Sequence, residues 1–225
     1  MKKILISWSS GKDSAWMLHQ LRQSGEYEIA GLLATINESA DRIAMHAVRR
    51  SLLQQQAQAA GLPLATIALP WPCSNQEYEV RLLRACSDAL ARGVQAIAFG
   101  DLFLADIRAY REKQLAGTGL EPLFPLWQQP TAELARQMIS AGLRARLTCI
   151  DPRALPPSFA GREFDEQLLA DLPPAVDRCG ENGEFHTFAY AGPMFSAPIA
   201  IESGEVVERD GFVFVDLLPA TGAAV

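Results

Sequence analysis

The polar segment formed by residues 9–14 has the composition of a loop that binds an anion. It follows the apolar run 4–6, which is too short for a typical helix and indicates a buried strand. A predicted helix then begins at Asp13. Small residues let backbone N–H groups approach an oxyanion, and a helix N-terminus adds roughly half a positive charge. The segment therefore predicts a phosphate or pyrophosphate site. Its members are Ser9, Ser10, Gly11, Lys12, Asp13 and Ser14.

Two well-known phosphate-binding loops are excluded. A Walker A motif requires a glycine five residues before its Gly-Lys pair, and Ile6 stands at that position. A Rossmann fingerprint requires three glycines after the strand, and this loop contains only Gly11. An ordinary strand–helix turn with exposed polar side chains remains the alternative.

A second dense polar cluster spans residues 180–187. Two glycines bracket an acid and an amide, and a second acid and a histidine follow. Carboxylates can hold an ammonium ion and then accept its proton, which is what an amine nucleophile requires. A polar turn before an edge strand is the alternative. The candidate side chains of this cluster are Glu181, Asn182, Glu184 and His186.

The third cluster spans residues 100–112 and begins where a predicted strand ends. In the functional interpretation, Asp101 lies at the mouth of a nucleotide crevice and the arginines hold an anionic substrate or a phosphate. In the other interpretation, Arg108 and Glu112 form an ordinary solvated pair four residues apart on a helix. The candidate residues here are Gly100, Asp101, Asp106, Arg108, Arg111 and Glu112.

Strand and helix patterns alternate from the N-terminus to about residue 150. We expect strands at 27–36, 64–69, 94–99, 121–126 and 143–150, with helices between them. This alternation predicts an α/β fold, with a parallel twisted sheet and helices on both faces. Ligands of such sheets bind at the carboxyl ends of the strands. Loop 9–14 and the Gly100-Asp101 pair both follow predicted strands, so we expect them to share one crevice.

The pattern changes near residue 151. Prolines interrupt the chain, a helix is predicted at 162–172, and short β-like segments follow at 185–190, 199–201, 206–207 and 212–217. We therefore predict two domains: residues 1–150 form an α/β domain, and residues 151–225 form a smaller α+β lobe.

Composition sets the class of protein. The chain has 225 residues, of which 49% are hydrophobic, and its net charge of −6 argues against broad electrostatic binding to nucleic acid. Its four cysteines contain no C-x-x-C pair, which favours free thiols in a reducing compartment. No stretch has the length of a signal-peptide core or a membrane span. We expect a cytoplasmic protein with no membrane association.

The three clusters together resemble one family. The Ser-Ser-Gly-Lys-Asp-Ser loop resembles the SGGKDS loop of the PP-loop ATP pyrophosphatases. With residues 100–112, the Phe-Pro-Leu-Trp run at 124–127 and the Gly-Glu-Asn-Gly-Glu-Phe-His-Thr run at 180–187, the chain resembles the diphthine–ammonia ligase (diphthamide synthetase) family over nearly its whole length. His46, with its neighbour Met45, also matches. Ser10 replaces a family glycine, and Ala191 replaces an aspartate.

The resemblance implies an adenine nucleotide alpha-hydrolase-like, Rossmann-like fold and an ATP- and Mg²⁺-dependent ligase. ATP would adenylate the carboxylate of diphthine on elongation factor 2, and ammonia would displace AMP. Residues 1–150 would form the ATP-binding domain, and residues 151–225 would complete the acceptor site. Loop 9–14 and Gly100 would bind ATP, and Asp13 would hold Mg²⁺. The implied catalytic residues are Lys12, Asp13, Asp101, Glu181, Asn182, Glu184 and His186. The implied substrate-binding residues are His46, Asp106, Arg108, Arg111 and Glu112.

Other functions stay open at this stage. A homologue could act on a different carboxylate or carbonyl acceptor. A PP-loop tRNA thiolase would require a catalytic cysteine pair or a basic RNA-binding face, and neither is visible. A non-catalytic adenine-nucleotide sensor of the same fold would not need residues 180–187. Whether the chain forms a homodimer is also open.

Overall fold

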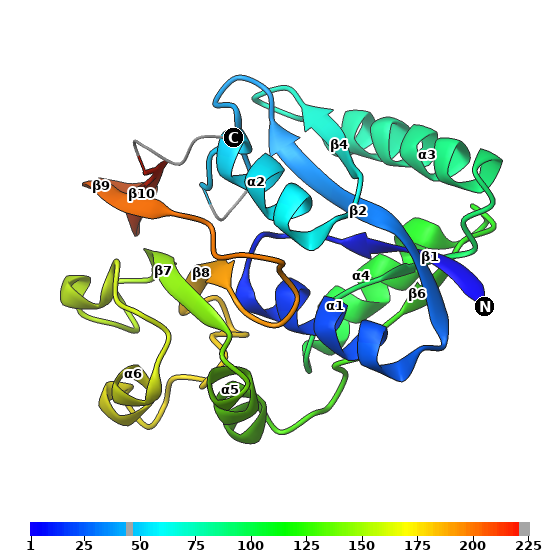
Figure 1. Ribbon diagram of the computed structural model, residues 1–225. Coiled ribbons are helices and arrows are strands. Elements are labelled where there is room, and N and C mark those ends of the chain that lie inside the picture. The colour runs from blue at the N-terminus through cyan, green and yellow to red at the C-terminus, as the bar shows by residue number, and fades with distance from the viewer. Residues whose placement is uncertain (44–46, 221–225) are drawn as a thin grey trace.

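The computed structural model describes residues 1–43 and 47–220, which form two sheets (Figure 1). The first sheet has the order β3-β2-β1-β5-β6, and β4 also pairs with β2. All its pairings are parallel except the short antiparallel contact of β3 with β2. Its strands are β1 (Lys2–Ser7), β2 (Tyr27–Asn37), β3 (Arg42–Ile43), β4 (Leu64–Leu69), β5 (Ala96–Ala98) and β6 (Glu121–Leu123).

Helices cover both faces of this sheet. The strand periodicity explains why, because alternate side chains of β1 point to opposite faces: Ile4 and Ile6 belong to one buried cluster, and Leu5 belongs to another. The predicted α/β architecture is confirmed. Helices α1 (Lys12–Ser24) and α2 (Arg50–Ala60) contribute to the first cluster, and α3 (Asn75–Ala91) and α4 (Ala105–Leu115) contribute to the second.

The second sheet is antiparallel, with the order β8-β7-β10-β9. Its strands are β7 (Arg144–Ile150), β8 (Phe185–Ala191), β9 (Ile201–Arg209) and β10 (Phe212–Pro219). Helix α5 (Thr131–Ser140), the 3₁₀ turn η1 (Pro157–Phe159) and α6 (Glu166–Asp171) complete this part of the chain. A parallel sheet followed by a smaller α+β lobe is the architecture that we predicted.

One strand lies in a different sheet from the one predicted. We expected residues 143–150 to extend the parallel sheet, but β7 pairs antiparallel with β8 and β10. A helix–strand alternation predicts the strand itself but not its partners, which here lie far along the chain. The change of sheet therefore falls between β6 and β7. The division into domains near residue 151 stays a prediction.

Two element boundaries also differ from the predictions. The predicted helix 162–172 is reduced to α6, because the side chain of Asp165 caps it by accepting the Leu168 N–H at 2.8 Å. Residues 206–207 belong to a longer continuous strand, β9, because β10 pairs with it along nearly its whole length. Of the predicted segment 199–201, only Ile201 lies in a strand, as the first residue of β9.

The two sheets share one hydrophobic core and meet at loop 9–14. One buried cluster includes Ile4 of the first sheet and Phe188 of the second, both with no exposed surface. At the free edge of β8, the Ala189 N–H donates to the Ser10 carbonyl at 2.9 Å. The hydroxyl of Thr187 accepts the Lys12 N–H at 3.1 Å. The edge strand of the second sheet thus finds its hydrogen-bond partners in the loop that follows β1.

A second connection uses charge. Asp216 of β10 accepts hydrogen bonds from Arg42 at 2.7 Å and from Arg49 at 2.5 Å. Burial raises the pKa of the Asp216 carboxyl, but the two arginines outweigh burial and hold it below its ordinary value. Because Arg42 lies on β3 and Arg49 is the N-cap residue of α2, Asp216 joins both elements to the second sheet.

We expect Asp216→Asn to lower the free energy of unfolding by about 1 kcal/mol, because it leaves two partly exposed guanidinium groups without a carboxylate. Urea unfolding measures the change. Asp210→Asn is the matched control: its carboxylate is 83% exposed beside Arg209, and asparagine tolerates the positive φ of 53° at this position. Equal effects of the two variants would contradict the expectation.

Candidate active site

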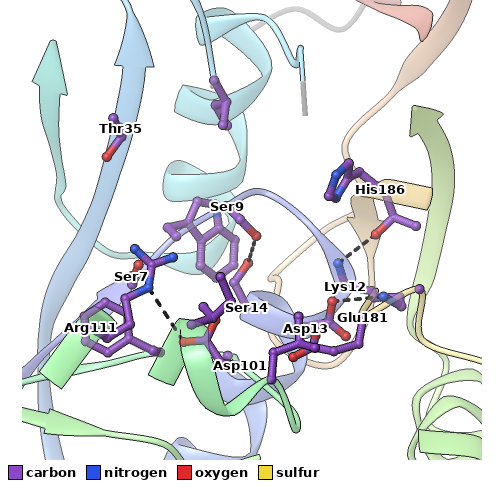
Figure 2. Close-up of a pocket in the computed structure, with 18 of the residues that line it drawn as sticks. Ser7, Ser9, Lys12, Asp13, Ser14, Thr35, Asp101, Arg111, Glu181 and His186 are labelled. Carbon is purple, nitrogen blue, oxygen red and sulfur yellow. Dashed lines mark hydrogen bonds and ion pairs between the residues drawn. The ribbon is translucent and has the colours of Figure 1, made fainter. Parts of the chain in front are cut away.

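A cavity of about 530 Å³ lies where β1, β2, β4 and β5 end, and residues 179–187 close one side of it (Figure 2). Its lining brings together residues from all three polar clusters. In the view of Figure 2, Arg111 and Ser7 lie at one end of the cavity, and Lys12 and His186 lie at the other. The predicted shared crevice of loop 9–14 and Gly100-Asp101 is therefore present.

Loop 9–14 has the predicted order of strand, tight turn and helix. The lining of the cavity includes Ser9, Lys12, Asp13 and Ser14. The hydroxyls of Ser9 and Ser14 lie 3.2 Å apart, and Ser9 also accepts the Gly11 N–H at 3.3 Å. Because α1 begins at Lys12, the N–H groups of its first turn and its dipole face the end of β1, and the Lys12 N–H among them donates to Thr187.

Ser10 takes the backbone conformation that glycine has without strain. Its φ is 69°, in the left-handed region. The side chain is fully buried and is absent from the cavity lining, and its hydroxyl has no hydrogen-bond partner in the described part of the chain. Ser10 thus adopts a left-handed backbone conformation of the kind that the family glycine takes without strain.

Lys12 is the most buried charge of the site, with 2% of its side chain exposed. Its ammonium donates to Asp13 Oδ2 at 2.9 Å and to the carbonyl of Cys179. Burial alone would lower the pKa of this ammonium, but the Asp13 carboxylate outweighs burial and raises it. The lysine thus stays charged and joins the start of α1 to the segment that precedes residues 180–187.

Glu181 connects the second and third clusters. Its carboxylate accepts the backbone N–H groups of Leu102 at 2.7 Å and Phe103 at 3.3 Å. Burial raises its pKa to about 7, against an ordinary value of 4.5. Asp101, which precedes these two residues, also lines the cavity, and burial raises the pKa of its carboxyl as well. Near neutral pH, Glu181 can therefore give up or accept a proton.

His186 lines the same end of the cavity as Lys12. Burial and, to a smaller extent, the Lys12 charge lower the pKa of the imidazole to about 4. The ring is consequently neutral at neutral pH. It can act there as a hydrogen-bond donor or acceptor without adding positive charge.

Asn182 and Glu184 do not line the cavity formed by the described residues. The Asn182 amide donates to Glu184 Oε1 at 3.0 Å, and the Asp177 N–H donates to the same oxygen at 2.9 Å. In the structure they therefore shape the loop that presents Glu181. Their predicted catalytic roles stay predictions.

Helix α4 directs its two arginines differently. Arg111 lines the cavity, with Nε 3.7 Å from Asp101 Oδ2. Arg108 instead donates to Glu112 at 2.8 Å, in the solvated pair that the sequence allowed. Its guanidinium also packs 4.7 Å from the ring centroid of Phe124. Only Arg111 is thus placed to touch a bound molecule.

The remaining substrate-binding candidates lie elsewhere. Asp106 is an exposed residue in the first turn of α4 and is absent from the lining that the structure describes. Arg108 and Glu112 are absent from that lining too. His46 falls outside the described residues, although Ile43, just before that gap, lines the cavity.

Sequence reasoning missed Asp177. One of its carboxylate oxygens accepts the N–H groups of Cys179 at 2.9 Å and Glu181 at 3.0 Å. The other accepts the Thr131 hydroxyl at 2.5 Å, which attaches the loop to α5. Aspartate side chains often accept the backbone N–H two residues further along the chain and so form turns. Asp177 does this with Cys179. Its position shortly before Gly180, another turn residue, could have identified it.

Asp13 offers a carboxylate oxygen that fits a magnesium ion bound with phosphates. The Oδ1 atom of Asp13 is buried and has no hydrogen-bond partner in the described structure. Mg²⁺ is commonly held by one or two carboxylates together with substrate phosphates. Residues 1–43 and 47–220 contain no group of three or more His, Cys, Asp or Glu side chains that could hold a metal. Asp13 therefore fits a shared site but not a complete protein cage.

Comparison with known proteins agrees with this arrangement. Residues 1–122 match the model of the diphthamide synthase N-terminal domain, and residues 130–217 match that of the C-terminal domain. The chain belongs to the diphthamide synthase family. The boundary between the two family domains falls near the change from β6 to β7.

Several curated relatives of this family carry the name diphthine–ammonia ligase. The Homo sapiens protein is 28% identical over an alignment of 232 positions, gaps included, which covers 92% of this chain and 85% of the human protein. The Danio rerio protein is 29% identical over an alignment of 240 positions, gaps included, which covers 95% of this chain and 92% of the Danio rerio protein. The likeness thus includes both sheets and all three polar clusters. No helix among the described residues is long and apolar enough to cross a bilayer.

We expect Glu181→Gln to flatten the pH dependence of stability. A raised carboxyl pKa means that the folded state binds more protons than the unfolded state between pH 4.5 and 7. The stability contribution is therefore complete below pH 4.5 and is lost as pH rises through 7. Allowing for solvent screening of this partly exposed group, the wild type should lose about 1 kcal/mol more than the variant between pH 5.5 and 8.

Urea unfolding at the two pH values measures this difference. Glu205→Gln, on an exposed position of β9, is the matched control and should follow the wild type. A Glu181→Gln protein with the same pH dependence as the wild type would show that burial does not raise the Glu181 pKa.

Proposed function

We propose that this protein is an ATP-dependent ligase that converts a carboxylate into an amide with ammonia. The acceptor that we propose is the carboxylate of diphthine on a translation elongation factor. Membership of the diphthamide synthase family supports the reaction class. The observation that carries the proposal is a single cavity lined both by the phosphate-type loop 9–14 and by the carboxylate and imidazole of Glu181 and His186.

In this proposal, loop 9–14 receives the pyrophosphate end of ATP. The backbone N–H groups at the start of α1 and the hydroxyls of Ser9 and Ser14 donate to phosphate oxygens, and the charge of Lys12 lies directly behind them. Asp13 would hold Mg²⁺, which supplies positive charge against the departing pyrophosphate. Gly100 suits this place because an added Cβ would lie 3.3 Å from the Asp13 backbone.

The first step forms a bond between an acceptor carboxylate oxygen and the α-phosphorus, and it breaks the bond from that phosphorus to pyrophosphate. In the second step, the ammonia nitrogen bonds to the acyl carbon, and AMP leaves with the oxygen. Ammonium must lose a proton before it attacks. The Glu181 carboxylate, with a pKa of about 7, is suited to take that proton near neutral pH.

Asp101 and Arg111 occupy the other end of the cavity. The Arg111 Nε and Asp101 Oδ2 atoms are buried, and neither has a hydrogen-bond partner in the residues described. A guanidinium with a free N–H group beside a cavity is suited to an anionic group of the bound substrates. Ala191, which departs from the family pattern, does not line the cavity as described.

The loop assignment predicts that Lys12→Ala lowers release of pyrophosphate from ATP by at least about a hundredfold, because a buried positive charge beside the phosphates is lost. Pyrophosphate is measured in the presence of ammonium and an elongation factor that carries diphthine. Lys113→Ala, on the exposed side of α4, should keep full activity. Retained release by a folded Lys12→Ala protein would remove the loop from the mechanism.

The two arginines of α4 provide a matched pair. We expect Arg111→Met to lower kcat/KM for amide formation by about tenfold or more, since a charge-assisted hydrogen bond contributes about 1.5–3 kcal/mol. Arg108→Met should change it less than twofold, because Arg108 faces Glu112 and Phe124 outside the cavity. AMP formation measures both. Equal losses would show that the cavity does not distinguish the two side chains.

A further inference from the structure

Gln56 is a fully buried amide whose hydrogen bonds all go to the site. It lies on α2, with no exposed surface. Its Oε1 accepts the indole N–H of Trp8 at 2.8 Å. Its Nε2 donates to the carbonyl of Ser10 at 2.9 Å and to the carbonyl of Ala189 at 2.6 Å. One side chain thus joins Trp8, which follows β1, to loop 9–14 and to β8.

The chemistry of the neighbours fixes the orientation of this amide. An indole N–H can only donate, so the atom facing Trp8 must be the amide oxygen. The amide nitrogen then faces two carbonyl oxygens, which can only accept. Both of its hydrogens are therefore used. Exchanging the oxygen and nitrogen would place a donor against the indole N–H and an acceptor against each of the two carbonyl oxygens.

Ser10 is the residue that needs this support. Its φ of 69° is a conformation that residues other than glycine rarely adopt. Its carbonyl accepts both from Gln56 and from the Ala189 N–H. These two bonds hold the carbonyl against β8 and α2. A Ser10 that relaxed to negative φ would rotate the adjoining peptide units of loop 9–14 and change which groups the loop presents to the cavity.

We propose that Gln56 is a positioning residue that holds loop 9–14 ready for nucleotide by clamping the Ser10 carbonyl to β8. The inference rests on the proposed function, because it names ATP as the ligand of the loop. It adds that the amide makes the loop and the β8 segment with Thr187 one rigid unit. Gln56 does not line the cavity within the described chain, so it acts through Ser10 and touches no substrate.

The test compares Gln56→Glu with Gln54→Glu, which makes the same change at an exposed position of the same helix. A carboxylate at position 56 cannot donate to the two carbonyls. At pH 8 we expect Gln56→Glu to weaken binding of Mg·ATP about tenfold or more, and Gln54→Glu to weaken it less than twofold. Calorimetric titration without acceptor measures the affinities, at a temperature where each unliganded variant is folded by circular dichroism.

A rescue separates positioning from general structural support. In a Ser10→Gly background, glycine adopts the positive φ without a clamp, so the loss caused by Gln56→Glu should shrink to about threefold or less. A structural role alone would give the same loss in both backgrounds. If Gln56→Glu does not fold, Gln56→Met, which removes the hydrogen bonds without adding charge, takes its place in both backgrounds.

The outcomes are distinct. Weaker binding that Ser10→Gly reverses supports the clamp. Unchanged affinity in the position 56 variant, or a loss of the same size in both backgrounds, overturns it. A wild-type protein that fails to bind Mg·ATP would instead contradict the proposed function. Amide hydrogen exchange of Gly11 and Lys12 without nucleotide would still test the clamp in that case, with faster exchange expected only in the position 56 variant and unchanged exchange overturning it.

Discussion

The free edge of β8 must find hydrogen-bond partners, and the loop after β1 supplies them. Ala189 pairs with the Ser10 carbonyl, and Thr187 accepts the Lys12 N–H. Because an unpaired buried backbone group is costly, this contact fixes the second sheet against the first. The cavity is a consequence of that contact, since loop 9–14 and residues 180–187 can only line one space when the two sheets meet at this edge.

Burial then sets the protonation of the groups around the cavity. Lys12 keeps its charge because Asp13 is adjacent, His186 loses its proton because it is buried near that lysine, and Glu181 is poised near neutral pH. Burial thus raises the pKa of the Glu181 carboxyl and lowers the pKa of the His186 imidazole, because it disfavours the charged form of each group. The result is a charged lysine at loop 9–14 with a titratable carboxylate beside it in the same cavity (Figure 2).

The sequence predicted local elements and motifs well, and their partners less well. The strand–loop–helix order of residues 4–21 is visible because periodicity and turn chemistry are local. The sheet of β7 was predicted wrongly, because pairing depends on strands far along the chain. Arg108 and Arg111 look alike in the sequence, and only the packing of α4 separates them. Gln56 bonds to backbone groups far along the chain, and no sequence motif predicts such a contact. Asp177 bonds to nearby backbone groups, for which the sequence carries only a local turn signal.

The wide separation in sequence of the residues that hold Lys12 has a consequence for synthesis of the chain. Its ammonium is paired by its neighbour Asp13 and by the carbonyl of Cys179, a partner 167 residues away. During translation, the strands of the first sheet are synthesised before Cys179, which supplies that carbonyl. Until β8 has been synthesised, Lys12 lacks this carbonyl and loop 9–14 lacks its contacts with Thr187 and Ala189, so the contacts that hold the loop can be completed only late in synthesis of the chain.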